Sequence, residues 1–263
     1  MDPYEKWRGS MGYPIDLEMG HAVNKYKDMK LKAINEGSRS NVVKLVCSKG
    51  NKRSFFNGFF YNNDSSLILS SGHISGFDNA DKYEALFFHG TEFEKSCELT
   101  LLHVGMFIRQ EVSNTGCCFN VYSPDVAVLK CPDDVDVQIG NSPRPFAEQV
   151  YQGASVCIVG YKGVDEPQLS ISDGIVSFVG LDIMHVAANA DNGYAGSPVL
   201  SSQGYVVGMV KGGVGTTIKQ VVEVVAVNKI HNFLISKGLP GFKGRCLWGF
   251  LQHEMLQSMQ QEC

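Results

Sequence analysis

Short apolar runs, separated by polar or glycine-containing turns, follow one another along most of the chain. Runs of this length between turn residues are typical of β-strands. In the first half they cover residues 42–47, 54–61, 66–71, 83–88, 98–104, 107–112 and 126–130. In the second half they cover residues 155–161, 169–179, 184–188, 198–200, 206–210 and 221–227. The pattern predicts an all-β protein with seven strand-like runs in its first half and six in its second.

Apolar residues at near-helical spacing occur in three segments outside these runs. Residues 16–36 predict a helix before the first strand. Residues 228–239 predict a closing helix that ends near Gly238 and whose apolar side holds Ile230, Phe233 and Leu234. Residues 247–259 predict a C-terminal helix packed on the body of the protein.

The composition suits a turn-rich β protein and narrows its partners. Of 263 residues, 44% are hydrophobic and 28 are glycine, which is enough for a sizeable core and many tight turns. The formal net charge is −4 and the pI is about 6.0, and basic residues are scattered apart from a short lysine set between positions 25 and 32. Nucleic-acid-binding surfaces need a broad basic patch, and a membrane helix needs about 18 apolar residues in a row. We expect neither nucleic acid binding nor membrane insertion.

The start of the chain carries Asp2, Glu5, Asp16 and Glu18 and no apolar stretch of the secretory type. Transit peptides are poor in acidic residues, so neither kind of targeting segment is visible. We therefore expect an intracellular protein of the cytoplasm, the nucleus or both.

Cysteine usage agrees with a reducing compartment. Four of the eight cysteines lie in or beside apolar runs, as reduced core thiols do: Cys47, Cys97, Cys131 and Cys157. A zinc site could be drawn from Cys97, His103, Cys117 and Cys118, but these residues lack the paired spacing typical of zinc ligands. We expect no metal ion and no cofactor.

Three motifs carry candidate chemistry, and they occur in the order histidine, aspartate, loop. His73 follows a strand in Ser70-Ser71-Gly72-His73-Ile74, and Asp125 begins Asp125-Val126-Ala127-Val128-Leu129-Lys130. Residues 191–200 read Asp-Asn-Gly-Tyr-Ala-Gly-Ser-Pro-Val-Leu. A serine hydroxyl becomes a nucleophile when an imidazole takes its proton, and a buried carboxylate must orient that imidazole. Ala195, the fifth residue of this loop, has no hydroxyl.

These motifs resemble the Deg/HtrA branch of trypsin-fold serine proteases, and the resemblance covers about residues 40 to 236. Residues 41–46 followed by 57–60 are similar to the first strands of that family, and residues 125–130 to the strand with its aspartate. Residues 153–161 and 173–177 resemble the opening of its second barrel. The resemblance implies an all-β fold of two six-stranded barrels, with an N-terminal helix and C-terminal helices added.

On this resemblance the chain divides into five parts. They are an extension (1–39), a first barrel (40–131), a proline-rich linker (132–150), a second barrel with its closing helix (151–239) and a tail (240–263). Residues 244–250 also faintly resemble the entrance to a PDZ module, which is the alternative to a C-terminal helix. Family members assemble through segments before the first barrel, so a homo-oligomer, a trimer or higher, is implied.

The resemblance also assigns roles. His73 is the general base, Asp125 orients it, and Ala195 occupies the nucleophile position. The backbone N–H groups of Gly193 and Ala195 form the oxyanion hole. Protein or peptide substrates are implied, with Asn189 at the floor of the primary pocket, Tyr194 beside the hole, and Lys211, Gly212 and Gly213 at the cleft edge, where a peptide adds as a strand.

Several alternatives stay open at this point. Gly212 and Gly213 are equally typical of a plain turn. The loop also resembles that of virus-encoded chymotrypsin-fold proteases, some of which use cysteine, and Ser197 is a second hydroxyl in it. The chain is either an endopeptidase inactivated by alanine at position 195 or a natural pseudoprotease that binds peptides. The retention of His73 and Asp125 favours the inactivated enzyme. Because Asn189 and Ala190 are uncharged, we expect a small or medium apolar side chain in the primary pocket.

Overall fold

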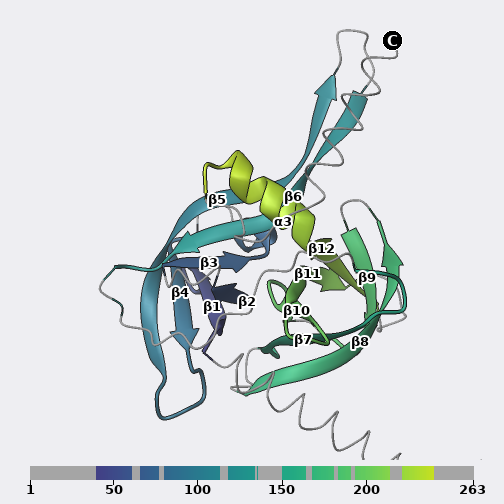
Figure 1. Ribbon diagram of the computed structural model, residues 1–263. Coiled ribbons are helices and arrows are strands. Elements are labelled where there is room, and N and C mark those ends of the chain that lie inside the picture. Colours follow the sequence, from purple (N-terminus) through teal and green to yellow (C-terminus); the bar gives the residue numbers. More distant parts are fainter. Residues whose placement is uncertain are drawn as a thin grey trace, which may run out of the picture.

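Two closed antiparallel β-barrels of six strands each lie side by side (Figure 1). The computed structural model describes residues 40–60, 66–76, 80–112, 118–133, 135, 150–163, 168–180, 183–190, 193–213 and 221–239. The double six-stranded barrel expected from the resemblance is therefore confirmed. The helix expected at residues 16–36, the tail 240–263 and most of the linker lie outside the described residues.

The first barrel has the closed order β1-β2-β3-β6-β5-β4. Its strands are β1 (Val42–Lys49), β2 (Lys52–Phe60), β3 (Leu67–Ser70), β4 (Lys82–Phe87), β5 (Lys95–Val112) and β6 (Cys118–Lys130). A tight turn at Gly50, whose φ of 54° suits glycine, joins β1 to β2. β5 and β6 together form a long hairpin that projects from the body (Figure 1).

The second barrel has the closed order β10-β11-β12-β9-β8-β7. Its strands are β7 (Ser155–Tyr161), β8 (Leu169–Val179), β9 (Ile183–Ala188), β10 (Pro198–Ser201), β11 (Val206–Gly213) and β12 (Val221–Ala226). The helix α3 (Val227–Ser236) follows β12 directly and buries Ile230, Phe233 and Leu234, as the sequence predicts. It ends before Gly238, whose φ of 70° places it in the left-handed region.

The first barrel contains six strands, as the resemblance implies, because two of the seven predicted runs form a single strand. Residues 98–104 and 107–112 belong to one strand, β5, whose pairing with β6 shifts register between Leu101 and His103 and again between Gly105 and Phe107. An extra residue at each shift bends a strand without ending it. Gly105 therefore lies at a register shift within one continuous strand and not at a turn.

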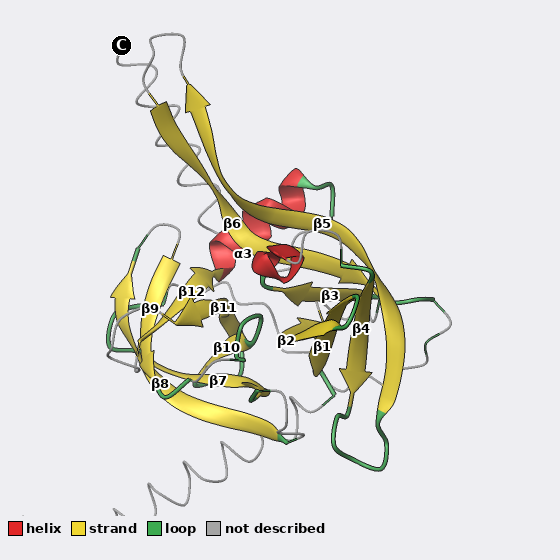
Figure 2. Ribbon diagram, turned by 180° about the vertical axis from the view of Figure 1, so that it is seen from behind, coloured by secondary structure: helices red, strands yellow, loops and turns green. Residues whose placement is uncertain are grey.

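In the part of the chain that the structure describes, the buried side chains form three apolar cores. One fills each barrel, and the third joins them: it combines Val42, Phe59 and Val128 of the first barrel with Val159, Leu200 and Met209 of the second. The apolar face of α3 belongs to this third core. Figure 2 shows α3 lying across the junction, where it contacts β6 of the first barrel and β11 and β12 of the second. The relative placement of the barrels thus depends on apolar burial in which both halves of the chain take part.

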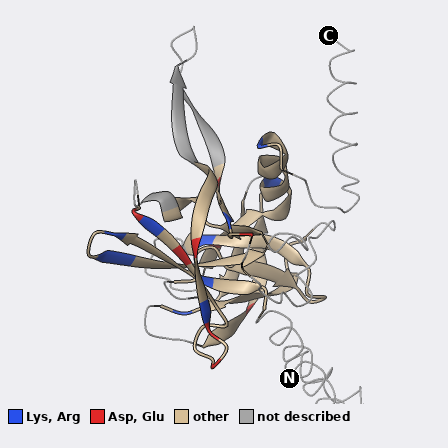
Figure 3. Ribbon diagram, turned by 90° about the vertical axis from the view of Figure 1, so that its left-hand side faces the viewer, with Lys and Arg blue, Asp and Glu red and all other residues tan. Residues whose placement is uncertain are grey.

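Charged residues of both signs are interspersed on the strands (Figure 3). Within the described ranges, no helix is both long and apolar enough to cross a membrane.

Candidate active site

His73 lies on the short 3₁₀ helix η1 (Gly72–Gly76), which begins just after β3. Gly72 is necessary at its start, because a Cβ atom there would lie 2.6 Å from the Gly105 carbonyl oxygen and 2.8 Å from Asp125 Oδ1. The absence of a side chain lets η1 approach β6 closely. This approach brings His73 against Asp125.

Asp125, on β6, is only 7% exposed, and both of its carboxylate oxygens accept hydrogen bonds from the histidine segment. Oδ1 accepts from the His73 backbone N–H at 2.7 Å. Oδ2 accepts from His73 Nδ1 at 2.8 Å and from Ser71 Oγ at 2.9 Å. A neutral imidazole that donates through Nδ1 has an unprotonated Nε2. His73 is therefore oriented to receive a proton at Nε2.

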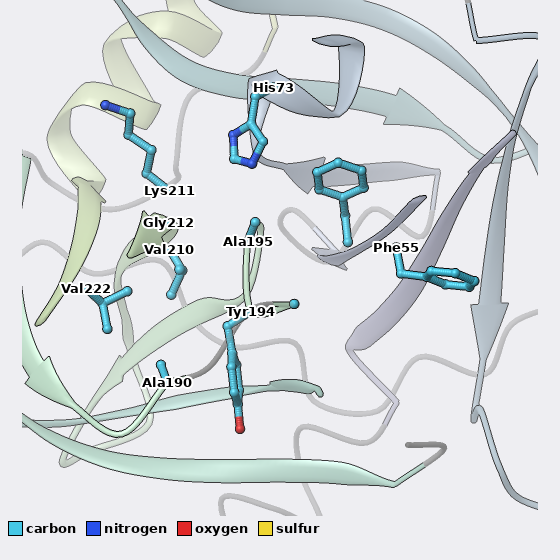
Figure 4. Close-up of a pocket in the computed structure, with 11 residues that line it drawn as sticks. Phe55, His73, Ala190, Tyr194, Ala195, Val210, Lys211, Gly212 and Val222 are labelled. Carbon is cyan, nitrogen blue, oxygen red and sulfur yellow. The ribbon is translucent and has the colours of Figure 1, made fainter. Parts of the chain in front are cut away.

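The His73 ring is held in place yet accessible. Its side chain is 40% exposed, and it meets the ring of Phe56 edge-on, with 5.5 Å between the centroids. Figure 4 shows the imidazole above Ala195 in one pocket. His73 of the first barrel and Ala195 of the second thus face each other across one cavity.

The loop that carries Ala195 is fixed by backbone hydrogen bonds and by two glycines. Gly193 and Gly196 have φ values of 116° and 83°, which other residues rarely adopt. The Gly196 N–H donates to the Val210 carbonyl at 2.9 Å, and the Ala195 carbonyl accepts from the Asn57 N–H at 2.8 Å. The loop is therefore tied to β11 in its own barrel and to β2 in the other.

The backbone N–H groups of Gly193 and Ala195 have no hydrogen-bond acceptor among the described residues. Their neighbours in the loop are paired: the Ser197 N–H donates to the Tyr194 carbonyl at 2.9 Å. Two unpaired N–H groups beside a nucleophile position are the requirement for an oxyanion hole.

Ser197, the second hydroxyl of the loop, is fully buried and packs over Gly160. It does not line the pocket that holds His73. Substrate cannot reach Ser197 in this arrangement, so it is not the nucleophile.

The order and spacing of these residues agree with a known sequence family. The profile of the trypsin-like peptidase domain matches residues 56–209, which is more than half of the chain and includes His73, Asp125 and Ala195. The chain belongs to the trypsin-like peptidase family. A search among curated proteins finds no match.

Solved structures share the fold of this trypsin-like peptidase at low sequence identity. A serine-to-alanine mutant of Rv3671c from M. tuberculosis H37Rv, in its inactive form, is 18% identical with a TM-score of 0.56, covering 79% of this chain and 92% of its own. The active form of the Rv3671c protease is 17% identical with a TM-score of 0.59, covering 80% and 86%. Deg5 is 15% identical with a TM-score of 0.58, covering 81% and 98%. The expected Deg/HtrA-like trypsin fold is thereby confirmed.

A cavity of about 250 Å³ lies between the barrels of this peptidase at His73 (Figure 4). The first barrel contributes Phe55, Phe56 and His73. The second barrel contributes Ala190, Gly193, Tyr194, Ala195, Val210, Lys211, Gly212 and Val222. Apart from His73, Lys211 and the two glycines, the lining residues have apolar or aromatic side chains.

Three of the predicted substrate-binding residues, Tyr194, Lys211 and Gly212, line this cavity. Lys211 donates to Glu223 Oε1 at 2.8 Å, so its charge is compensated within the protein. Asn189 does not line the cavity: its side chain is exposed, its carbonyl accepts from Ser172 Oγ at 2.8 Å, and Ala190 forms the wall instead. Gly213 continues β11 opposite Val222.

Tyr194 points away from His73 and into the second barrel (Figure 4). It is 2% exposed, packs in the core of that barrel, and its hydroxyl forms a hydrogen bond with Ser170 Oγ. The side chain therefore does not crowd the two free N–H groups.

Sequence reasoning missed six side chains of the site. Four of them come from barrel strands and line the pocket: Phe55, Phe56, Val210 and Val222. Ser71 donates to Asp125, and Asn57 forms hydrogen bonds with the loop that carries Ala195. Ser71 and Asn57 stand in the two segments that carry the family resemblance, which is the signal that could have drawn attention to them.

Proposed function

We propose that this chain is the body of an endopeptidase that cleaves proteins or peptides, with Ala195 in place of its serine or cysteine nucleophile. The observation that carries the proposal is the intact Asp125–His73 pair facing Ala195. Asp125 accepts from both the Nδ1 and the backbone N–H of His73, at 2.8 and 2.7 Å. A structural histidine needs no such orientation toward a cleft, whereas a general base does.

The chemistry follows from the positions of the groups. A hydroxyl or thiol at position 195 would lose its proton to His73 Nε2 as it attacks the scissile carbonyl carbon, and Asp125 would stabilise the imidazolium. The carbonyl oxygen would gain negative charge opposite the N–H groups of Gly193 and Ala195. Protonated His73 would then pass the proton to the departing amine, and water would release the acyl group by the same route.

The pocket supports an apolar side chain before the scissile bond. Ala190, Val210 and Val222 offer small apolar walls, and the Lys211 ammonium is paired with Glu223. A Cβ atom on Gly212 would meet nothing within 4 Å, so β11 has room beside it for a substrate backbone. A small or medium apolar residue, bound in an extended segment along residues 211–213, fits this site.

The second candidate is a pseudoprotease that binds such peptides without cutting them. Ala195 itself favours it, because ground-state contacts with the cleft do not need the nucleophile. Both candidates predict peptide binding by this chain. They differ in whether a hydroxyl or thiol added at position 195 leads to peptide cleavage.

The deciding experiment is Ala195→Ser, with Ala195→Cys beside it, assayed on casein and on a peptide library with cleavage sites read by mass spectrometry. We expect specific cleavage after apolar residues, with a rate that falls in acid because a protonated imidazole accepts no proton. The matched control is Ala195→Ser with His73→Ala, which should lose most of the gain. Two folded variants that bind peptides yet cleave nothing and react with no serine- or cysteine-directed probe would establish the pseudoprotease.

A further inference from the structure

Asn57 occupies the junction between the barrels, directly behind the loop that carries Ala195. It lies on β2 and is fully buried. It does not line the cavity, so substrate does not touch it. Its contacts nevertheless reach three separate segments of the chain.

The side-chain amide connects β2 to the second barrel by three hydrogen bonds. Nδ2 donates to the Gly193 carbonyl at 2.6 Å and to the Tyr161 carbonyl at 3.1 Å. Oδ1 accepts from the Tyr161 N–H at 2.7 Å. Because a backbone N–H only donates, the atom facing it must be the amide oxygen, which fixes the orientation of the amide.

The backbone of Asn57 adds two further bonds at the same place. Its N–H donates to the Ala195 carbonyl at 2.8 Å, and its carbonyl accepts from Ser70 Oγ at 2.6 Å. Any non-proline residue at position 57 could donate the backbone hydrogen bond to the Ala195 carbonyl. The contact with Gly193 requires a side chain with a donor at the right reach, and it acts on a residue that lines the pocket.

The packing around the amide leaves little room for rearrangement. Cβ atoms at Gly160 and Gly196 would collide with Ser197 Oγ and with the Asn57 carbonyl oxygen, respectively. The Asn57 amide is thus enclosed by glycine backbone, and a loop that moved would lose its bonds without replacement. A buried amide with all its partners in place has a single favoured arrangement.

We infer that Asn57 is a positioning residue that holds Gly193 and Ala195 in register with His73. For its catalytic consequence the inference rests on the proposed function; for the structure of the loop it does not. His73 and Asp125 belong to the first barrel and the two N–H groups to the second, so their alignment depends on ties between the barrels. Asn57 is the tie that acts on the loop at both Gly193 and Ala195.

Asn57→Asp tests this with the least change of shape. It keeps the acceptor for the Tyr161 N–H but turns the two donor contacts into repulsion between a carboxylate and two carbonyl oxygens. If Asn57→Asp does not fold, Asn57→Ser tests the positioning role instead. The serine side chain is too short to bond the Gly193 carbonyl, and it adds no charge. Leu99→Ala, a truncation in the core of the first barrel, is the control for a general loss of stability.

The first measurement uses the chain as it is, with Ala195, and does not depend on catalysis. Amide hydrogen exchange should accelerate by about tenfold or more at Gly196 and Ser197 in the Asn57 variants, while strand amides of both barrels keep their protection. Leu99→Ala should not show this local pattern. Unchanged loop protection, or the same pattern in Leu99→Ala, would overturn the inference.

The second measurement places Asn57→Asp and Asn57→Ser in the Ala195→Ser background. We expect kcat to fall by about 10- to 100-fold at nearly constant KM, because misplacement of about 1 Å carries costs of this order and the apolar walls of the pocket remain. An unchanged kcat, or a rise in KM alone, would refute the positioning role. If Ala195→Ser itself is inert, the proposed function fails, and hydrogen exchange alone decides the role of Asn57.

Discussion

Replacing Ser197 by alanine should stabilise the protein, although the residue lies at the centre of the molecule. Ser197 is fully buried, and its Oγ has no hydrogen-bond partner among the described residues. A buried hydroxyl without a partner costs about 1–3 kcal/mol of desolvation. Alanine removes this cost and leaves only a small void, so we expect the free energy of unfolding to rise by about 1 kcal/mol.

The assay is urea unfolding followed by far-UV circular dichroism, with the midpoint compared at constant m-value. Ser70→Ala is the matched control, because Ser70 is equally buried but its Oγ donates to the Asn57 carbonyl at 2.6 Å. That variant should lose about 1 kcal/mol. The same chemical change should therefore have opposite signs at two positions on either side of the barrel junction.

A loss of stability in Ser197→Ala as large as that in Ser70→Ala would refute the reasoning, since it would mean that the Ser197 hydroxyl has a partner. The variant also bears on function. In the Ala195→Ser background, Ser197→Ala should keep full activity, whereas loss of activity would show that the buried hydroxyl takes part in the reaction.

Two further predictions concern the catalytic pair and a core thiol. Asp125→Asn in the Ala195→Ser background should lower kcat by about 10⁴-fold, because an amide that donates to Nδ1 imposes the wrong tautomer on His73; a chromogenic peptide measures this, and a loss below tenfold would contradict it. Burial raises the pKa of Cys47 from 9.0 to about 12. The unfolded thiol ionises first as pH rises above 9.0, so the free energy of unfolding should decline toward pH 12, by up to about 1.4 kcal/mol per pH unit from this group. Cys47→Val should flatten that decline in urea unfolding at several alkaline pH values, and an identical slope in both proteins would argue against the assignment.

Most of the fold could be predicted because its signals are local. The apolar runs and turn residues predict the ends of β7 and β8 as observed. For the other strands of the second barrel, the predicted ends lie close to the observed ones. The same signals divided β5 into two runs. Gly105 lies at a register shift inside this strand, and a pattern of a few residues does not distinguish such a shift from a turn. The prediction also ended β11 at Val210, because glycines are not typical of strands. In the structure the strand continues through Gly212 and Gly213.

The site was predictable where the chemistry is carried by residue type and order, as for His73 and Asp125. The direction of the Tyr194 side chain was not, because its partner Ser170 lies on another strand. Asn57 reaches residues 104 and 136 positions away, which no local pattern contains. The assigned roles, the assembly into oligomers, the intracellular location and the absence of a metal ion and a cofactor stay predictions.

The division of the site between two barrels has a consequence for how the chain matures. β1–β6 close into one barrel within residues 42–130, and β7–β12 close into the other within residues 155–226. His73 and Asp125 both belong to the first barrel, whereas Gly193 and Ala195 belong to the second. The cavity that His73 and Ala195 line forms only when the two barrels dock. The helix α3, which follows all twelve strands in the sequence, contributes to the apolar core of that junction. The cleft between the barrels is therefore complete only after all twelve strands and α3 have been synthesised.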